Sequence, residues 1–107
     1  MHCDRKEESP AKAAARPPEE AVVRRRNRMA ALWAAELLGL IGQAAHDYAR
    51  ELVGAHDHLP DEEHVVGRLS RDLKGVVTAH EIREKLSHLW HEARRQLLRE
   101  TKPPGGA

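Results

Sequence analysis

The sequence predicts an all-α protein, an irregular four-helix bundle with a disordered N-terminal arm. Three observations lead to this fold class. The helix-forming residues Ala, Leu, Glu, Arg and Lys dominate the composition. No run of Val, Ile or Thr alternates with polar residues, as the residues of a half-buried strand would. Four apolar patterns recur at helical spacing, and the short links between them are typical of antiparallel neighbouring helices.

The first eighteen residues show no apolar periodicity and contain three prolines, so we expect a disordered arm. Inside it, Ser9 is placed to cap a short helix over residues 11–16, with Pro10 at the first helical position. A helix of that length is marginal in water and would form on a partner. We therefore expect an arm at residues 1–18, a bundle at 19–101 and a disordered tail at 102–107.

The first long helix is expected over residues 19–38. Its first half, with little to bury beyond Val22 and Val23, is expected to project beyond the bundle. Gly39 can take the left-handed conformation that closes a helix, and Leu40 then folds back onto the last turn. Trp33 and Trp90 are expected to be the two large anchors of the core. The buried face is predicted from residues at helical spacing: Met29, Trp33, Leu37 and Leu40, with Ala30, Ala34 and Leu38 beside them.

A second helix is expected over residues 43–54. A third begins after Pro60, which stands at its start, and Gly75 ends it. The fourth is marked by a capping box of Thr78 and Glu81. Each helix has an amphipathic pattern. The apolar positions are Ile41, Ala45, Tyr48, Ala49, Leu52 and Val53; then Val65, Val66, Leu69 and Leu73; then Ile82, Leu86, Leu89, Trp90, Ala93 and Leu97.

The charge is unevenly distributed along the chain. The net charge is +1, but the first 28 residues carry eight Lys and Arg against five Asp and Glu, and the remainder carries ten against twelve. A basic arm on a mildly acidic body predicts that the arm meets an acidic partner surface, although a solvated tail would also account for it. No apolar run is long enough to span a bilayer, no signal peptide is visible, and Cys3 has no second cysteine to pair with. We expect a cytoplasmic protein.

Catalytic and metal-binding motifs are not found. His80, Glu84 and His88 share one helix face, but no recognised zinc spacing is present, so solvent-facing histidines are the favoured interpretation and no metal is expected. No Gly-rich phosphate loop follows a strand, and no Ser or Cys nucleophile has a discernible base partner. We therefore expect neither an enzyme nor a cofactor, and nucleotide binding has no motif to support it.

Several short blocks carry a family resemblance. They are Arg25-Arg26-Asn27, the block around Trp33 that ends in Gly39-Leu40, Tyr48-Ala49-x-Glu51, Asp61-Glu62-x-x-Val65, Leu69-x-x-Asp72-Leu73-x-Gly75 and Ile82-Arg83-x-Lys85. Together they resemble the ATPase inhibitor subunit zeta family of alphaproteobacteria. The resemblance implies a regulatory protein that binds the catalytic head of F-type ATP synthase and blocks ATP hydrolysis by inserting its N-terminal arm. It also implies a peripheral location on the membrane-bound synthase.

The resemblance implies that charged positions of the arm and of the first helix contact the partner. Other functions stay open: a synthase-binding bundle with weak or lost inhibition, a small helical nucleic-acid-binding protein that uses its arginine cluster, or a nucleotide sensor. The first follows because family arms carry Phe, which this chain lacks, and because Pro17 and Pro18 interrupt the arm. The expected contact residues are Asp4, Arg5, Lys6, Glu7, Lys12, Arg16, Glu19, Glu20, Arg24, Arg25 and Arg26.

Overall fold

The computed structural model describes residues 17–54 and 61–100. These residues form four helices and no strand: α3 (Glu19–Leu37), α4 (Gln43–Gly54), α5 (Glu62–Asp72) and α6 (Ala79–Glu100). The predicted all-α four-helix fold is confirmed. Disorder was predicted for the arm, residues 1–18, and for the tail, residues 102–107; of these, residues 1–16 and 102–107 lie outside the described part. No helix in the described part is long and apolar enough to cross a membrane.

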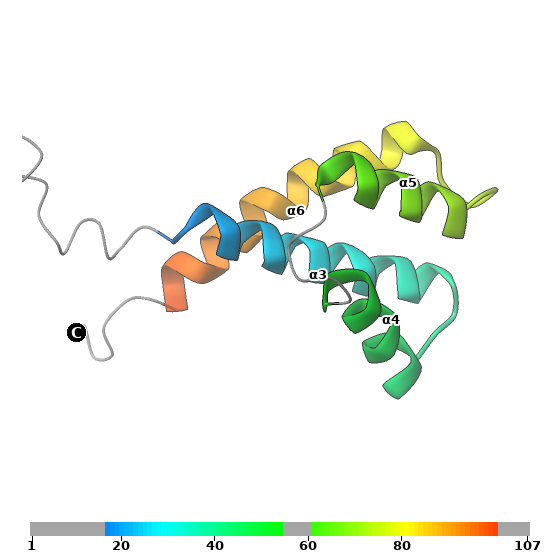
Figure 1. Ribbon diagram of the computed structural model, residues 1–107, viewed down its shortest axis with the longest axis horizontal. Helices are drawn as coiled ribbons and strands as arrows, with labels where there is room; N and C mark the ends of the chain where they lie inside the picture. Colours follow the sequence, from blue (N-terminus) through cyan, green and yellow to red (C-terminus); the bar gives the residue numbers. More distant parts are fainter. Residues whose placement is uncertain (1–16, 55–60, 101–107) are drawn as a thin grey trace, which may run out of the picture.

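The two long helices, α3 and α6, lie side by side and run in opposite directions (Figure 1). The short helix α4 folds back against α3, and α5 folds back against α6 (Figure 1). Helix α3 packs against each of the other three helices. The fold is therefore two helical hairpins that share the α3–α6 contact, which is why the bundle is irregular.

The core lies against an alanine face of α3. Ala30, Ala31, Ala34 and Ala35 are fully buried, and the first three join a cluster with leucine, valine and isoleucine side chains of the other helices. The prediction was right for Ala30 and Ala34, which are fully buried. It was wrong for the large residues beside them: Met29 and Trp33 are only partly buried, and Leu37 and Leu38 are 41% and 38% exposed. Because neighbouring helices approach on the side of the small residues, the large side chains are left at the edge of the contact.

The first half of α3 does not project beyond the bundle, contrary to the sequence prediction. Val22, Arg26 and Asn27 are all buried. The prediction failed because it counted apolar residues only on α3. Helix α6 has 22 residues and runs far enough to cover this half, as the contact between Arg25 and Glu100 shows.

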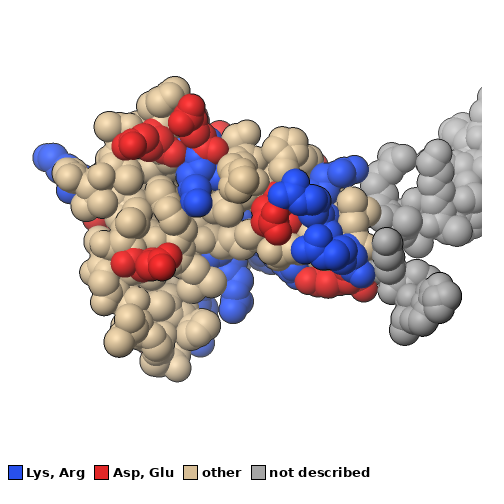
Figure 2. Space-filling model, turned by 180° about the vertical axis from the view of Figure 1, so that it is seen from behind, with Lys and Arg blue, Asp and Glu red and all other residues tan. Residues whose placement is uncertain are grey.

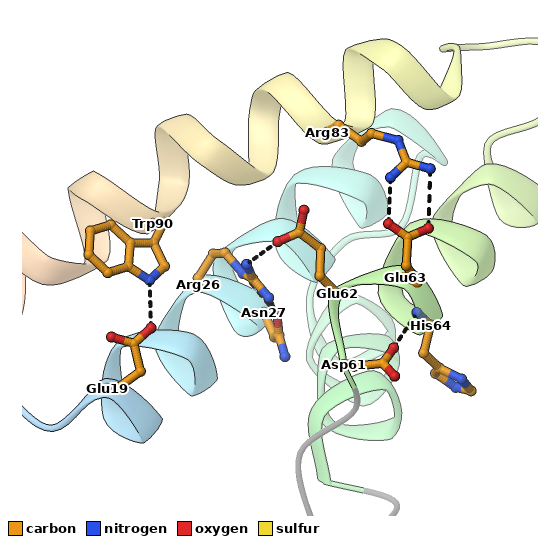
Figure 3. A network of polar contacts seen from close by, with 9 residues as sticks. All are labelled: Glu19, Arg26, Asn27, Asp61, Glu62, Glu63, His64, Arg83 and Trp90. Carbon is orange, nitrogen blue, oxygen red and sulfur yellow. Dashed lines mark hydrogen bonds and ion pairs between the residues drawn. The ribbon is translucent and has the colours of Figure 1, made fainter.

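Two other predicted core residues are less buried than expected. Ile41 is 83% exposed, because it lies in the link between α3 and α4, two residues before α4 begins, and not on the apolar face of α4. Trp90 is half-buried, and its Nε1 donates to a carboxylate oxygen of Glu19 at 3.3 Å (Figure 3). Neither tryptophan is therefore a fully buried anchor.

The helix ends follow the predicted signals closely. Gly39 has φ +81°, and the Leu40 N–H donates to the Ala35 carbonyl at 2.9 Å, which is the hydrogen bond of a Schellman motif. Thr78 and Glu81 form the capping box, with the Glu81 N–H donating to Thr78 Oγ1 at 3.1 Å. The start of α5 differs slightly, since Asp61 is its N-cap and accepts from the His64 N–H at 2.8 Å. Pro60, the predicted start, lies outside the described residues.

The alanine face generates a test within one helix. Ala34→Leu should destabilise the protein by about 1–3 kcal/mol, because the larger side chain enters a fully packed contact. Leu37→Ala should cost less than about 1 kcal/mol, because the side chain is partly exposed. Ala and Leu have similar helix propensities, so urea unfolding of the two variants compares packing alone. A larger loss of stability for Leu37→Ala than for Ala34→Leu would support the predicted buried face with Leu37 in it and contradict the alanine face.

Candidate partner-binding site

The structure describes five of the eleven predicted contact residues, and all five lie in the first two turns of α3. They are Glu19, Glu20, Arg24, Arg25 and Arg26. The other six, Asp4, Arg5, Lys6, Glu7, Lys12 and Arg16, lie outside the described residues. This end of α3 is the end from which the arm leaves, and the backbone at Pro18 is extended, with φ −63° and ψ 145°.

The start of α3 is tied to the end of α6 by polar contacts. Arg25 donates to both carboxylate oxygens of Glu100, at 2.6 and 2.8 Å, and to Gln96 at 3.0 Å. The hydrogen bond with Arg25 lowers the pKa of the Glu100 carboxyl. A forked pair of this kind fixes direction as well as distance. Together with the Trp90–Glu19 contact it holds the first turns of α3 in place (Figure 3).

Arg26 is buried and serves the fold directly. Its guanidinium donates to Asn27 Oδ1 at 2.8 and 3.1 Å and to Glu62 of α5 at 3.2 Å (Figure 3). Asn27 is 0% exposed, and its Nδ2 has no hydrogen-bond partner in the part of the chain that the structure describes. A buried charge of this kind is kept because it is paired and hydrogen-bonded. Its burial leaves Arg26 little surface to offer a partner.

A second polar cluster joins α4 to α5. The Tyr48 hydroxyl donates to Asp72 at 2.7 Å, and Arg68 Nε donates to the same carboxylate oxygen at 2.9 Å. Arg68 also contacts Glu51 at 3.4 Å and stands over the Tyr48 ring at 5.4 Å from its centroid. Tyr48, Glu51 and Asp72 all belong to blocks that carry the family resemblance, so these blocks mark contacts between helices.

Titration of this cluster follows from its burial and its partners. Burial raises the pKa of Tyr48, and the hydrogen bond to Asp72 raises it further. Burial also works to raise the pKa of Asp72, but hydrogen bonds from Tyr48 and Arg68 outweigh it and leave that pKa lowered. The cluster is therefore held in the form with a neutral phenol and a charged carboxylate.

A basic groove opens between α3 and α4, next to α6. Its volume is about 620 Å³. The apolar part of its lining is Ala21, Ala49, Val53 and Leu97, and the basic part is Arg24, Arg25, Arg28, His46 and Arg50. On the face shown in Figure 2, charged side chains crowd the narrow end of the molecule, whereas the broad end is mostly uncharged. The groove residues of α3 belong to the half of the helix nearest the arm.

Arg28, His46 and Arg50 were absent from the predicted contact set. All three residues are exposed. The packing of α4 against α3 brings them to one groove, and helical periodicity alone carries no signal of that packing.

Metal binding finds no support in the described residues. No group of three or more His, Cys, Asp or Glu side chains there is arranged to hold a metal ion. His80 contacts Glu84 at 3.3 Å on an exposed helix face, and His88 is exposed as well. His56, His58 and Cys3 lie outside the described part.

Arg26 gives a test of the buried polar cluster. Arg26→Ala should destabilise the protein by about 1.5–3 kcal/mol, because it removes hydrogen bonds to a charged group and leaves Asn27 Oδ1 buried without its donors. Arg24→Ala, two residues earlier and mainly solvent-exposed, should change stability by less than about 0.5 kcal/mol. Urea unfolding at one pH compares them. Equal losses of stability in the two variants would contradict the conclusion that buried Arg26 stabilises the fold.

The single tyrosine of the chain makes the α4–α5 cluster directly measurable. The pKa of Tyr48 is raised in the folded state, so its contribution to stability is present below pH about 10, the ordinary tyrosine value, and is lost as the pH rises above it. Tyr48→Phe should lower stability at pH 7 by about 1 kcal/mol and flatten the alkaline decline. Phenolate absorbance should show the wild-type midpoint above 10. A midpoint at the ordinary value would contradict the contact.

Comparison with known families identifies the chain. No curated protein and no solved structure matches it. A family model, ATPase inhibitor subunit zeta, matches residues 18–96, which include all four described helices except the last residues of α6. The family consists of regulatory subunits that inhibit ATP hydrolysis by F-type ATP synthase, and its members are not enzymes. The chain belongs to the ATPase inhibitor subunit zeta family.

Proposed function

We propose that this protein binds the catalytic head of F-type ATP synthase and blocks ATP hydrolysis by inserting residues 1–18 between head subunits. The observation that carries the proposal is the family match over residues 18–96. The uneven charge adds support, because the first 28 residues carry the excess of basic side chains. In this proposal the protein works in the cytoplasm, peripherally on the membrane-bound synthase.

The described helices support the proposal as a rigid base for the arm. The contacts of Arg25 with Glu100 and of Trp90 with Glu19 hold the first turns of α3 against α6. A fixed exit point reduces the freedom that the arm loses on binding. If the helices also touch the head, they raise the local concentration of the arm at its site. We accordingly divide the chain into an arm at residues 1–18, a bundle at 19–101 and a tail at 102–107.

The proposed contacts follow the charged positions at the arm and at the start of α3. Arg24 and Glu20 are both more than half exposed, and their 3.7 Å contact is weak enough to be exchanged for a partner. Glu19 and Arg25 already bind α6, so they act by fixing the start of α3. Arg26 supports the fold from inside. The remaining proposed contacts are Asp4, Arg5, Lys6, Glu7, Lys12 and Arg16.

A truncation separates binding from inhibition. The full chain should slow ATP hydrolysis by the cognate catalytic head, and the chain lacking residues 1–18 should bind the head more weakly without slowing hydrolysis. Surface plasmon resonance measures the binding, and a coupled hydrolysis assay measures the rate. Inhibition by the truncated chain would place the inhibitory part in the helices and contradict arm insertion. Binding without inhibition by the full chain would identify a silent, synthase-bound subunit.

The two prolines before α3 give a sharper test. Helix α3 begins at Glu19, because the backbone of Pro18 is extended and Pro18 is the N-cap. The Pro18 carbonyl accepts a hydrogen bond from the Ala21 N–H at 3.0 Å. A helix continued from the arm into α3 would suffer from both prolines, at about 3 kcal/mol or more for each interior position. Pro17→Ala with Pro18→Ala should therefore strengthen inhibition. Pro103→Ala with Pro104→Ala, at the other end of the chain, is the control. Weaker inhibition by the first variant would mean that the break belongs to the bound shape.

A further inference from the structure

The basic groove between α3 and α4 has cationic side chains that the fold itself leaves uncommitted. Arg28 has no hydrogen-bond or ion-pair partner within the described residues. Among the residues that the structure describes, Arg24 contacts Glu20 at 3.7 Å and pairs with no other carboxylate. Arg50 pairs with Asp47 on its own helix, and both side chains are more than half exposed. Exposed pairs of this kind contribute about 0–1 kcal/mol, so a better anionic partner displaces them easily.

The lining of the groove indicates the chemistry of its ligand. Guanidinium groups match carboxylates in a forked geometry, and three of them, from Arg24, Arg28 and Arg50, border an aliphatic floor. That floor consists of alanine, valine and leucine side chains, and the lining includes no Phe, Tyr or Trp, the large rings on which nucleic-acid bases usually stack. The combination favours a peptide with carboxylates around an aliphatic residue.

The place of the groove indicates the source of that peptide. Its α3 residues, Ala21 to Arg28, begin three residues after Pro18, where the arm leaves the helix. At 1.5 Å per residue, Arg28 lies only about 14 Å along the helix axis from Glu19. A protein that takes up the arm therefore comes within reach of the groove.

We propose that this groove is a docking site for an acidic segment of the synthase head, with aspartate or glutamate side chains on Arg24, Arg28 and Arg50 and an aliphatic side chain on the floor between them. This inference rests on the proposed function and adds a second contact to it. Arginines at a partly desolvated interface are frequent centres of binding energy, and the apolar floor excludes water from them.

Charge reversal with a matched control tests the groove. The groove variant is Arg28→Glu with Arg50→Glu, and the control is Arg94→Glu with Arg95→Glu on α6, outside the groove. The two variants have the same net charge. Each variant removes one arginine that forms no ion pair within the described residues, and one that pairs three residues away on its own helix. The second arginine is Arg50, which pairs with Asp47, or Arg95, which pairs with Glu92. All four side chains are exposed, so both variants should melt like the wild type.

Binding to the isolated catalytic head at physiological salt is the readout. The groove variant should lose affinity by about ten-fold or more, and the control should stay within about two-fold of wild type. A photo-cross-linking residue at position 50 should then capture a head-subunit peptide rich in Asp and Glu. Equal losses in both variants would show a general effect of net charge and overturn the docking site.

Two further outcomes separate the groove from the proposed function. If the wild type binds and inhibits while the groove variant does so equally well, the docking site is wrong and arm insertion stands. If the wild type fails to bind the head, the proposed function fails, and the groove loses its partner with it. Tight binding of inorganic pyrophosphate, abolished by the groove variant alone, would assign the groove to a phosphate ligand and overturn the peptide.

Discussion

The close packing of helices on the alanine face of α3 is the constraint on which the rest of the structure depends. Ala30, Ala31, Ala34 and Ala35 have no exposed surface, and α3 packs against each of the other helices. Small side chains allow neighbouring backbones to approach closely, so leucine, valine and isoleucine from the other helices fill the space. A chain without phenylalanine can build a packed core in this way, because short distances replace large side chains.

Polar contacts between helices add orientation to this packing. Arg26 with Glu62 joins α3 to α5, Tyr48 with Asp72 joins α4 to α5, and Arg83 with Glu63 at 2.7 Å joins α5 to α6. Most of these residues lie in the blocks that resemble the zeta family. These blocks therefore contain residues that form contacts between helices. The family match over residues 18–96 accordingly concerns the bundle more than the arm.

Polar contacts between α3 and α6 bear on the proposed inhibition. The contacts of Arg25 with Glu100 and of Trp90 with Glu19 hold the start of α3, so the point at which the arm joins the helices has a defined place. The basic groove lies on the same half of α3. The proposed mode of action combines a folded base, a docking groove and an inserted arm, and each part can be removed separately by the variants described above.

The sequence by itself determined the fold class, the helix ends and the family. Those features depend on local signals: helical periodicity, the Thr78–Glu81 capping box, the left-handed Gly39 and short motif blocks. Tertiary structure alone decided that the alanines of α3, rather than its large residues, lie at the centre of the buried face. It alone also decided that Arg26 is buried while Arg24 is exposed, and that Arg28 and Arg50 border one groove. Periodicity tells which residues share a face of one helix, whereas burial depends on which neighbour approaches that face and how closely. The neighbouring helices pack on the small alanines, and the pattern of a single helix does not contain that information.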